Sequence, residues 1–242
     1  MIRAYATSDV GKVRELNEDY FSVSYPEDEI QLFIVADGMG GYNGGEIASQ
    51  LAVSSVKNYI TSNFNESKET REDLLDLVVS STQYANMIVY ENAQSHEDLH
   101  KMGTTLDVCL IYKGKAYISH IGDSRIYRYR KGFFRKLTKD HSYVQELVDE
   151  GKITKEEGQN HPKKNMLMKA LGVAPFIEPD AMIKGFMKDD IYLMCTDGLT
   201  NMLSELQIAK IIDENPVDAT KLLIQAANDA GGVDNVTAII IR

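Results

Sequence analysis

The sequence has no tryptophan, only five prolines among its 242 residues, and a deficit of positive charge. Lys and Arg number 26 against 36 Asp and Glu, and the net charge of −10 argues against nucleic acid or an anionic membrane as partner. No Pro-rich linker interrupts the chain, and its length allows one large domain or two small ones. No apolar stretch approaches the roughly 18 residues of a membrane span, and the N-terminus has no apolar signal core.

Cysteine is scarce as well. Cys109 and Cys195 are the only two, and each lies inside an apolar run. Such thiols are typically buried and reduced in core strands. We therefore expect a cytoplasmic protein that folds without a disulfide.

Hydrophobic periodicity predicts helices in two pairs, with runs of strands around them. The expected helices are 46–64, 72–93, 204–212 and 217–230, with Ser204 and Asn215 as caps. Lys113-Gly114 and Lys131-Gly132 are typical of hairpin turns, and hairpins imply antiparallel pairing. The predicted fold class is therefore α+β, a stack of antiparallel sheets with helices outside. The expected strands are 3–8, 20–25, 31–36, 105–112, 115–121, 126–130, 177–186, 191–195 and 235–241.

Residues 140–172 differ from the rest of the chain. They carry one expected short helix, 142–150, followed by polar and basic residues with Gly151, Gly158 and Pro162. This composition predicts a surface excursion beside the core.

Aspartates stand at the ends of apolar runs at several places. Asp37, Asp123 and Asp197 each follow such a run, and Asp234 precedes the last one. Taken singly, each Asp favours a turn. Together, the four carboxylates favour a common site for hard cations such as Mg²⁺ or Mn²⁺, which prefer oxygen ligands.

Arg14 lies close in sequence to Glu15, Glu18 and Asp19. A guanidinium binds phosphate through two parallel hydrogen bonds, so Arg14 is a candidate phosphate ligand beside such metals. On this stretch alone, a surface ion pair is the simpler interpretation.

Two other motifs are chemically suggestive but incomplete. The glycine-rich segment 38–45 has the outline of a nucleotide-binding loop, yet Asn43 replaces the third required glycine and no Lys-Ser/Thr pair follows. The stretch from His96 to His100 matches the H-E-x-x-H pattern of zinc peptidases. That mechanism needs both histidines on one helix face, and this stretch lies at a polar helix end.

Read together, seven ordered segments resemble the metal-dependent Ser/Thr protein phosphatases of type 2C, most closely the compact bacterial branch. They cover nearly the whole chain. The segments are Ser8-Asp9-Val10-Gly11 with Arg14 and Asn17-Glu18-Asp19, Val35-Ala36-Asp37-Gly38-Met39-Gly40-Gly41, Gly103-Thr104-Thr105, Gly122-Asp123-Ser124-Arg125, Leu137-Thr138-Lys139-Asp140-His141-Ser142, Thr196-Asp197-Gly198-Leu199 and Asp234-Asn235-Val236-Thr237.

The resemblance implies a single domain over residues 1–242, built as a four-layer α-β-β-α sandwich. It also implies a mobile flap over about 140–172 and a binuclear Mn²⁺/Mg²⁺ site at one end. Asp37 would bridge the two metals, the Gly38 carbonyl would ligate one, and Asp197 and Asp234 the other. Glu18 and Asp19 would act near or through water, Asp123 with Asp197 would hold a third metal, and Arg14 would bind the substrate phosphate.

One position departs from the eukaryotic branch of that family. A histidine proposed as general acid stands there two residues after the bridging aspartate, whereas this chain has Met39. A thioether cannot donate a proton, so the resemblance leaves the donor to the leaving group open. His141 and His161, at or in the expected flap, are candidates that are as readily explained as surface histidines.

The implied function is hydrolysis of phosphoserine and phosphothreonine in proteins, as a cytoplasmic monomer in signal transduction that opposes a Ser/Thr kinase. One alternative is a catalytically silent relative that only binds phosphoproteins, but such proteins typically lose metal carboxylates that this chain keeps. A zinc peptidase built on His96 and His100 is the more remote alternative.

Overall fold

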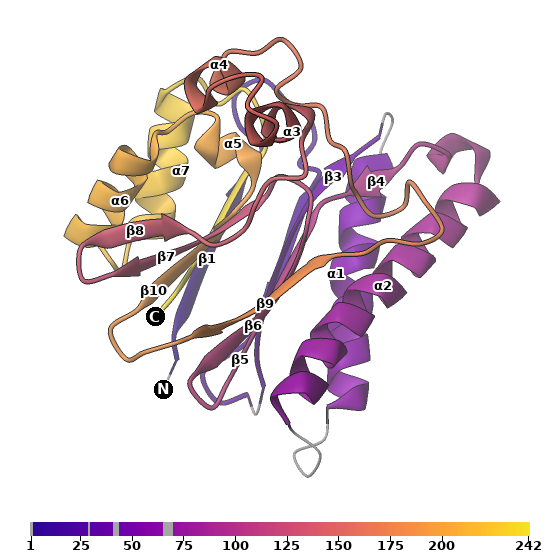
Figure 1. Cartoon of the computed structure of the whole chain (residues 1–242), viewed down its shortest axis with the longest axis horizontal. Coiled ribbons are helices and arrows are strands. Elements are labelled where there is room, and N and C mark those ends of the chain that lie inside the picture. The colour runs from indigo at the N-terminus through magenta and orange to yellow at the C-terminus, as the bar shows by residue number, and fades with distance from the viewer. Residues whose placement is uncertain (1, 29, 41–43, 65–69) are drawn as a thin grey trace.

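Two antiparallel sheets pack face to face, and helices cover the outer face of each (Figure 1). The computed structural model describes residues 2–28, 30–40, 44–64 and 70–242. One apolar core lies between the sheets and one lies under each helical layer. The expected α+β fold with four α-β-β-α layers is confirmed.

The first sheet joins the two ends of the chain. Its spatial order is β1 (Ala4–Asp9), β11 (Val236–Ile241), β10 (Ile191–Cys195), β7 (Arg125–Arg130) and β8 (Phe133–Lys136). Every residue of β11 is buried, which explains its unbroken apolar run. The edge strand β8 was not predicted, because its four residues are short of apolar alternation and half of them are exposed.

The second sheet carries Asp37. Its order is β2 (Asp19–Val23), β3 (Gln31–Met39), β5 (Leu106–Tyr112), β6 (Lys115–Ile121) and β9 (Asp180–Gly185), and β4 (Gly103–Thr104) pairs with the end of β3. Asp19 and Asp37 are register partners across β2 and β3. The pairing therefore sets the two carboxylates at the same end of the sheet.

The long helices form the two predicted pairs. Helices α1 (Gly44–Asn63) and α2 (Arg71–Ser95) cover the second sheet, and α6 (Glu205–Glu214) and α7 (Ala219–Asp229) cover the first (Figure 1). Ser204 caps α6 as predicted, through a reciprocal bond with Gln207. Asn215 is confirmed as a cap as well, since it is the residue that ends α6, and Asp218 precedes α7.

Both predicted hairpin turns are present. Lys113 and Lys131 have φ of 44° and 49°, and the glycines that follow them have φ of 72° and 81°. Two successive positive φ values characterise the tight turn whose twist matches antiparallel strands.

The excursion at 140–172 contains two helices, α3 (Tyr143–Asp149) and α4 (Lys155–Gln159), where the sequence predicted only the first. Thr154 caps α4 with Glu157, a signal that the short polar segment does carry. The excursion returns to the body through a bridge between Thr104 and Leu171. Single-domain organisation with a flap over about 140–172 remains an expectation.

Candidate metal centre

Six acidic side chains lie at one end of the sandwich, contributed by five segments. Asp37 is in β3, Glu18 and Asp19 are at the start of β2, Asp123 and Asp234 precede β7 and β11, and Asp197 opens the short helix α5 (Asp197–Thr200). The carboxyls of Asp37 and Asp197 lie within hydrogen-bonding reach of each other. The structure thus brings together every acidic residue that the sequence predicted for the site.

The proximity of these carboxyls raises their pKa values. Burial, and then the charges of Asp19, Asp197, Asp123 and Asp234, hold the pKa of Asp37 well above its ordinary value. Burial and neighbouring aspartates raise the pKa of Asp19 to about 7 and that of Asp123 to about 8. The fold by itself therefore disfavours full ionisation of this cluster.

Asp37 is held by its backbone. Its N–H donates to Thr105 Oγ1 at 2.9 Å, and its carbonyl accepts from the Thr104 hydroxyl at 2.9 Å and the Thr105 N–H at 2.9 Å. Thr105 Oγ1 also lies 2.8 Å from Ser124 Oγ, next to Asp123. One buried hydroxyl pair thereby ties the Asp37 backbone to the segment that carries Asp123.

Gly38 stands where two backbones nearly touch. A Cβ at Gly38 would lie 2.1 Å from the carbonyl oxygen of Gly45 and 2.7 Å from that of Glu18. Only glycine fits this approach, which seats the start of α1 beside the Glu18 carboxylate. The Gly45 N–H lowers the pKa of that carboxyl, but burial outweighs it and the pKa is raised.

Asp19 is the most buried member, at 6% exposure. Its Oδ2 accepts from the hydroxyls of Thr196 and Thr237 at 2.9 and 2.7 Å. Its Oδ1 is buried, and no polar atom of the described residues pairs with it. A buried carboxylate oxygen without a partner is costly unless a cation or water serves it, which fits a metal site.

Arg14 contacts the cluster across 220 positions of sequence. Its Nη2 and Nε donate to the two Asp234 carboxylate oxygens at 3.0 and 2.9 Å. A guanidinium has five N–H donors, so three remain after this fork. The side chain is 50% exposed, and the remaining donors are accessible to an anion beside the carboxylates.

Two asparagines that support the site were not singled out from the sequence. Asn235 donates to the carbonyls of Val10 and Leu16 and accepts from the Glu18 N–H, all at 2.9–3.0 Å. Asn201 donates to Asp197 Oδ2 at 2.9 Å. Asn235 follows a predicted ligand directly, and that adjacency was the one available signal.

The two histidines and Met39, considered above as to proton donation, make contacts outside the carboxylate cluster. His141 Nδ1 accepts from the Gly122 N–H at 3.1 Å, and its ring stacks on His120 at 4.8 Å between centroids. His161 lies in the flap against the ring of Tyr143. Met39 packs toward Gly103. None of the three is hydrogen-bonded to the carboxylate cluster in the described structure.

The zinc-peptidase motif does not form one helix. His96 ends α2 in an extended conformation, with φ −129° and ψ 118°, and Glu97–Leu99 then form a separate 3-10 turn. The two histidines therefore do not share a helix face, as that mechanism requires. The nucleotide-loop interpretation falls on Gly41, Tyr42 and Asn43, which lie outside the described residues.

The chemistry of the donor set fits divalent cations. Carboxylates that raise one another's pKa, together with an unpaired buried oxygen, supply the oxygen-only environment of Mg²⁺ or Mn²⁺. Within the described chain, no three of these side chains already converge on a single point. The cluster therefore has the acidic oxygen donors that divalent cations need, but these donors do not converge on one coordination position.

A groove leads away from the cluster. Its volume is about 750 Å³, and it runs from Asp123 and Asp197 between the flap and the start of α6, past Lys136 and Lys139. In the part of the chain that the structure describes, no helix has the length and apolar character to cross a membrane.

Comparison with known proteins agrees with this geometry. The family model described as protein phosphatase 2C matches residues 12–221. The serine/threonine phosphatase stp of Listeria innocua is 37% identical over 239 residues, covering 97% of this chain and 93% of the relative. The solved serine/threonine phosphatase PstP/Ppp of Mycobacterium tuberculosis is 35% identical with a TM-score of 0.90, covering 99% of this chain and 97% of that one.

A further solved structure contains the catalytic domain of PstP in complex with two manganese ions. It is 35% identical with a TM-score of 0.86, over 99% of this chain and 97% of that one. Family, fold and near-complete coverage agree with the resemblance found in the sequence. The chain belongs to the protein phosphatase 2C family.

Proposed function

We propose that this chain is a metal-dependent protein serine/threonine phosphatase that hydrolyses phosphoserine and phosphothreonine. The observation that carries the proposal is the cluster of six acidic side chains at the end of the sandwich, beside a guanidinium with donors to spare. The relatives named above are serine/threonine phosphatases, which supports the same substrate class.

Two Mn²⁺ or Mg²⁺ ions per subunit would be held by Asp37, the Gly38 carbonyl, Asp197 and Asp234, with Glu18 and Asp19 acting through water. Asp123 would contribute with Asp197 to a third ion. When bound, such ions supply hydroxide near neutral pH and stabilise the charge that develops on the phosphoryl oxygens. The supporting observation is the raised pKa of Asp37 and Asp197, which burial and then the neighbouring carboxylates cause.

The residues of the chain bind and orient the ester. Arg14 offers three N–H donors to the phosphate while its other two hold Asp234. Cys109 and Cys195 are fully buried, and burial raises the pKa of both thiols, so neither is a nucleophile. Hydrolysis then proceeds by direct attack of water on phosphorus, without a phosphoenzyme. Met39 donates no proton to the leaving alkoxide.

We further propose that the enzyme acts as a cytoplasmic monomer in signal transduction and opposes a Ser/Thr kinase. Two unpaired cysteines in the core suit a reducing compartment. A phosphoprotein phosphatase also needs a kinase to supply its substrate, which is the chemical reason for that partner.

The test is turnover of a phosphothreonine peptide with Mn²⁺, with and without chelator. We expect activity that the chelator abolishes, and a loss of about a hundredfold or more in Asp37→Asn. Independently of turnover, Mn²⁺ at 100 times its Kd stabilises a protein by about 2.7 kcal/mol, which for this chain length is a rise of roughly 5–10 °C in Tm.

Asp213→Asn is the matched control, because Asp213 lies on α6, away from the cluster, where its carboxylate accepts from the Tyr129 hydroxyl. It should keep both the activity and the thermal shift. An inactive wild type would overturn the enzyme, and an Asp37→Asn variant with full activity and the full shift would overturn the site.

A further inference from the structure

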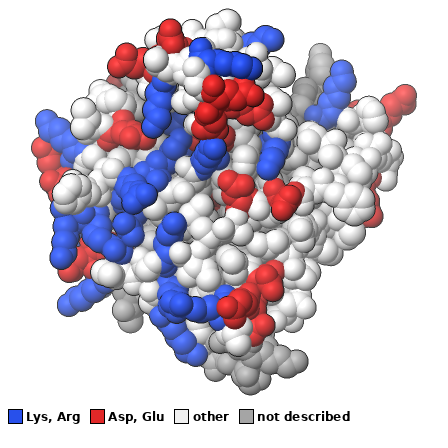
Figure 2. All heavy atoms as spheres, viewed as in Figure 1, with Lys and Arg blue, Asp and Glu red and all other residues white. Residues whose placement is uncertain are grey.

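Positive charge is concentrated on one part of this acidic protein. Nine of the 26 Lys and Arg fall between residues 113 and 139, a stretch with one acidic residue, Asp123. This stretch contains β6, β7 and β8. Figure 2, in the view of Figure 1, shows Lys and Arg gathered on the side where β7 and β8 lie.

Several of these cations are already neutralised, and others are not. Arg125 and Lys136 bind Asp140, Arg130 binds Asp190, and Lys139 binds Asp149. By contrast, four cations have no ion pair with any carboxylate among the described residues. We call these four the β7–β8 cationic surface: Arg128, Lys131, Arg135 and, from β9, Lys184.

The register places two of them directly opposite each other. Arg128 of β7 pairs with Arg135 of β8, so both side chains stand on one face of the sheet. Tyr127, the neighbour of Arg128, packs under the helices, so this face is the one turned away from them. Like charges directly opposite each other across two strands are destabilising, so a bound anion would reduce the repulsion between these two guanidinium groups.

The end of β9 meets the same place. Arg130 Nη2 donates to the Gly185 carbonyl at 2.9 Å, and the Tyr192 hydroxyl donates to the same oxygen at 3.2 Å. Lys184 precedes Gly185 and therefore lies at this junction. Arg128 Nε is buried and has no partner among the described atoms, so part of its donor capacity is unused.

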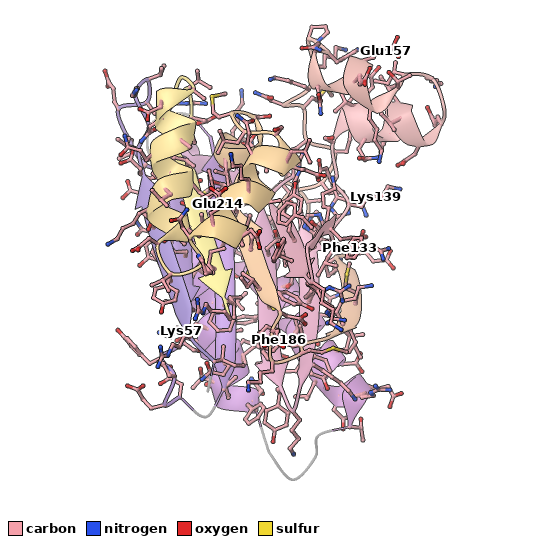
Figure 3. The ribbon with its side chains drawn as sticks, turned by 90° about the vertical axis from the view of Figure 1, so that its left-hand side faces the viewer. Lys57, Phe133, Lys139, Glu157, Phe186 and Glu214 are labelled. Carbon is pink, nitrogen blue, oxygen red and sulfur yellow. The ribbon has the colours of Figure 1, made fainter. Side chains whose placement is uncertain are left out.

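The surface adjoins the groove of the metal centre across the edge strand β8. Lys136, next to Arg135 on β8, stands on the opposite face of the sheet with its register partner Tyr127, and it lines that groove together with Lys139 and Asp123. Figure 3 shows Phe133, at the start of β8, and Lys139 along one side of the molecule below Glu157 of α4. A chain lying in the groove could thus reach Arg135 by passing over the free edge of β8.

We propose that the β7–β8 cationic surface binds an acidic segment of the phosphoprotein substrate, about five residues from the phosphorylated side chain. The proposal rests on the proposed phosphatase function. Arg128 is five residues beyond Asp123, and both a strand and an extended peptide advance about 3.3 Å per residue. A phosphoresidue at the carboxylate cluster therefore sets its fifth neighbour beside Arg128 and Arg135.

The test uses phosphothreonine peptides with three glutamates centred five residues before or after the phosphoresidue, each compared with its glutamine counterpart. We expect wild-type kcat/KM to favour one glutamate peptide by about three- to tenfold at low salt, as exposed charge pairs allow. The preference should shrink as salt is raised. It should vanish in Arg128→Gln/Arg135→Gln, whose activity on the glutamine peptides stays that of wild type.

Lys210→Gln/Lys221→Gln is the matched control, since it removes two exposed charges from the helices α6 and α7. It should keep the preference. A second pair, Lys131→Gln/Lys184→Gln, should weaken the preference and covers the case in which the arginine variant fails to fold, as judged by Tm.

The possible results distinguish failure of the docking surface from failure of the proposed phosphatase function. No turnover of any peptide would contradict the phosphatase. Turnover without a glutamate preference, or a preference that survives both variant pairs, would contradict only the docking surface and would leave the charges as protection of the β8 edge. Tighter binding of an RNA oligonucleotide than of the glutamate peptide, measured by anisotropy, would likewise overturn the assignment to acidic protein segments.

Discussion

Replacement of Asn235 by alanine tests how the loop that carries Arg14 and Glu18 is held. The Asn235 side chain donates to the carbonyls of Val10 and Leu16 and accepts from the Glu18 N–H. The side chain is 5% exposed, so water replaces these bonds poorly. Three hydrogen bonds at about 1 kcal/mol each give a loss of about 3 kcal/mol in the free energy of unfolding.

For a chain of this length, that loss lowers Tm by roughly 6–12 °C. Thermal unfolding by circular dichroism measures the shift. Phosphatase assays should show a parallel fall in kcat/KM, because Arg14 and Glu18 lose their fixed position beside Asp234. Activity should fall even at temperatures where the variant remains folded.

Asn228→Ala is the control. Its amide donates one bond, to Asp9 Oδ1 at 3.0 Å, and its own Oδ1 accepts nothing from the described residues. This variant should therefore lower the free energy of unfolding by about 1 kcal/mol or less. If Asn235→Ala unfolds no earlier than Asn228→Ala, the loop is held by something other than this side chain and the reasoning is refuted.

Two further predictions concern packing and charge. Gly38→Ala should lower the free energy of unfolding by more than about 3 kcal/mol and remove activity, because its Cβ would meet a backbone carbonyl at 2.1 Å. Gly185→Ala is the control: its Cβ would meet nothing within 4 Å, so this variant should leave thermal unfolding unchanged. Burial raises the pKa of Asp140, but Arg125 and a lysine more than offset it, so the pKa is lowered. Asp140→Asn should thus lower the free energy of unfolding by about 2–3 kcal/mol at pH 7. Denaturant titrations should show this difference from wild type shrinking as pH falls below about 4 toward the lowered pKa. An undiminished difference at pH 3 would be inconsistent with the ion pair.

Elements with strong local signals were predicted well. The strands 115–121 and 191–195 have the predicted bounds, because each is a buried apolar run closed by a turn. Lys113-Gly114 was identified as a tight turn, and its positive φ values confirm it. In these places, local propensity and tertiary packing favour the same structure.

Elements that depend on distant contacts were missed. Strand β8 has one half-buried phenylalanine under the helices, and its other residues are an exposed phenylalanine and two cations, so only its pairing with β7 makes it a strand. The last long helix was predicted from residue 217, yet α7 begins only at Ala219, after Asp218. Propensity over a few residues cannot include such requirements.

The sequence by itself determined the family and the class of fold and predicted the acidic residues of the site, because ordered motifs and apolar periodicity are local properties of the chain. Tertiary structure alone decided which groups share an environment. Arg14 binds Asp234 across 220 positions, and Asp19 accepts from Thr196 and Thr237. It also decided which cations stay unpaired, since Arg128 and Arg135 face each other only through the β7–β8 register. Charge acts through distance in space, which the order of residues does not specify.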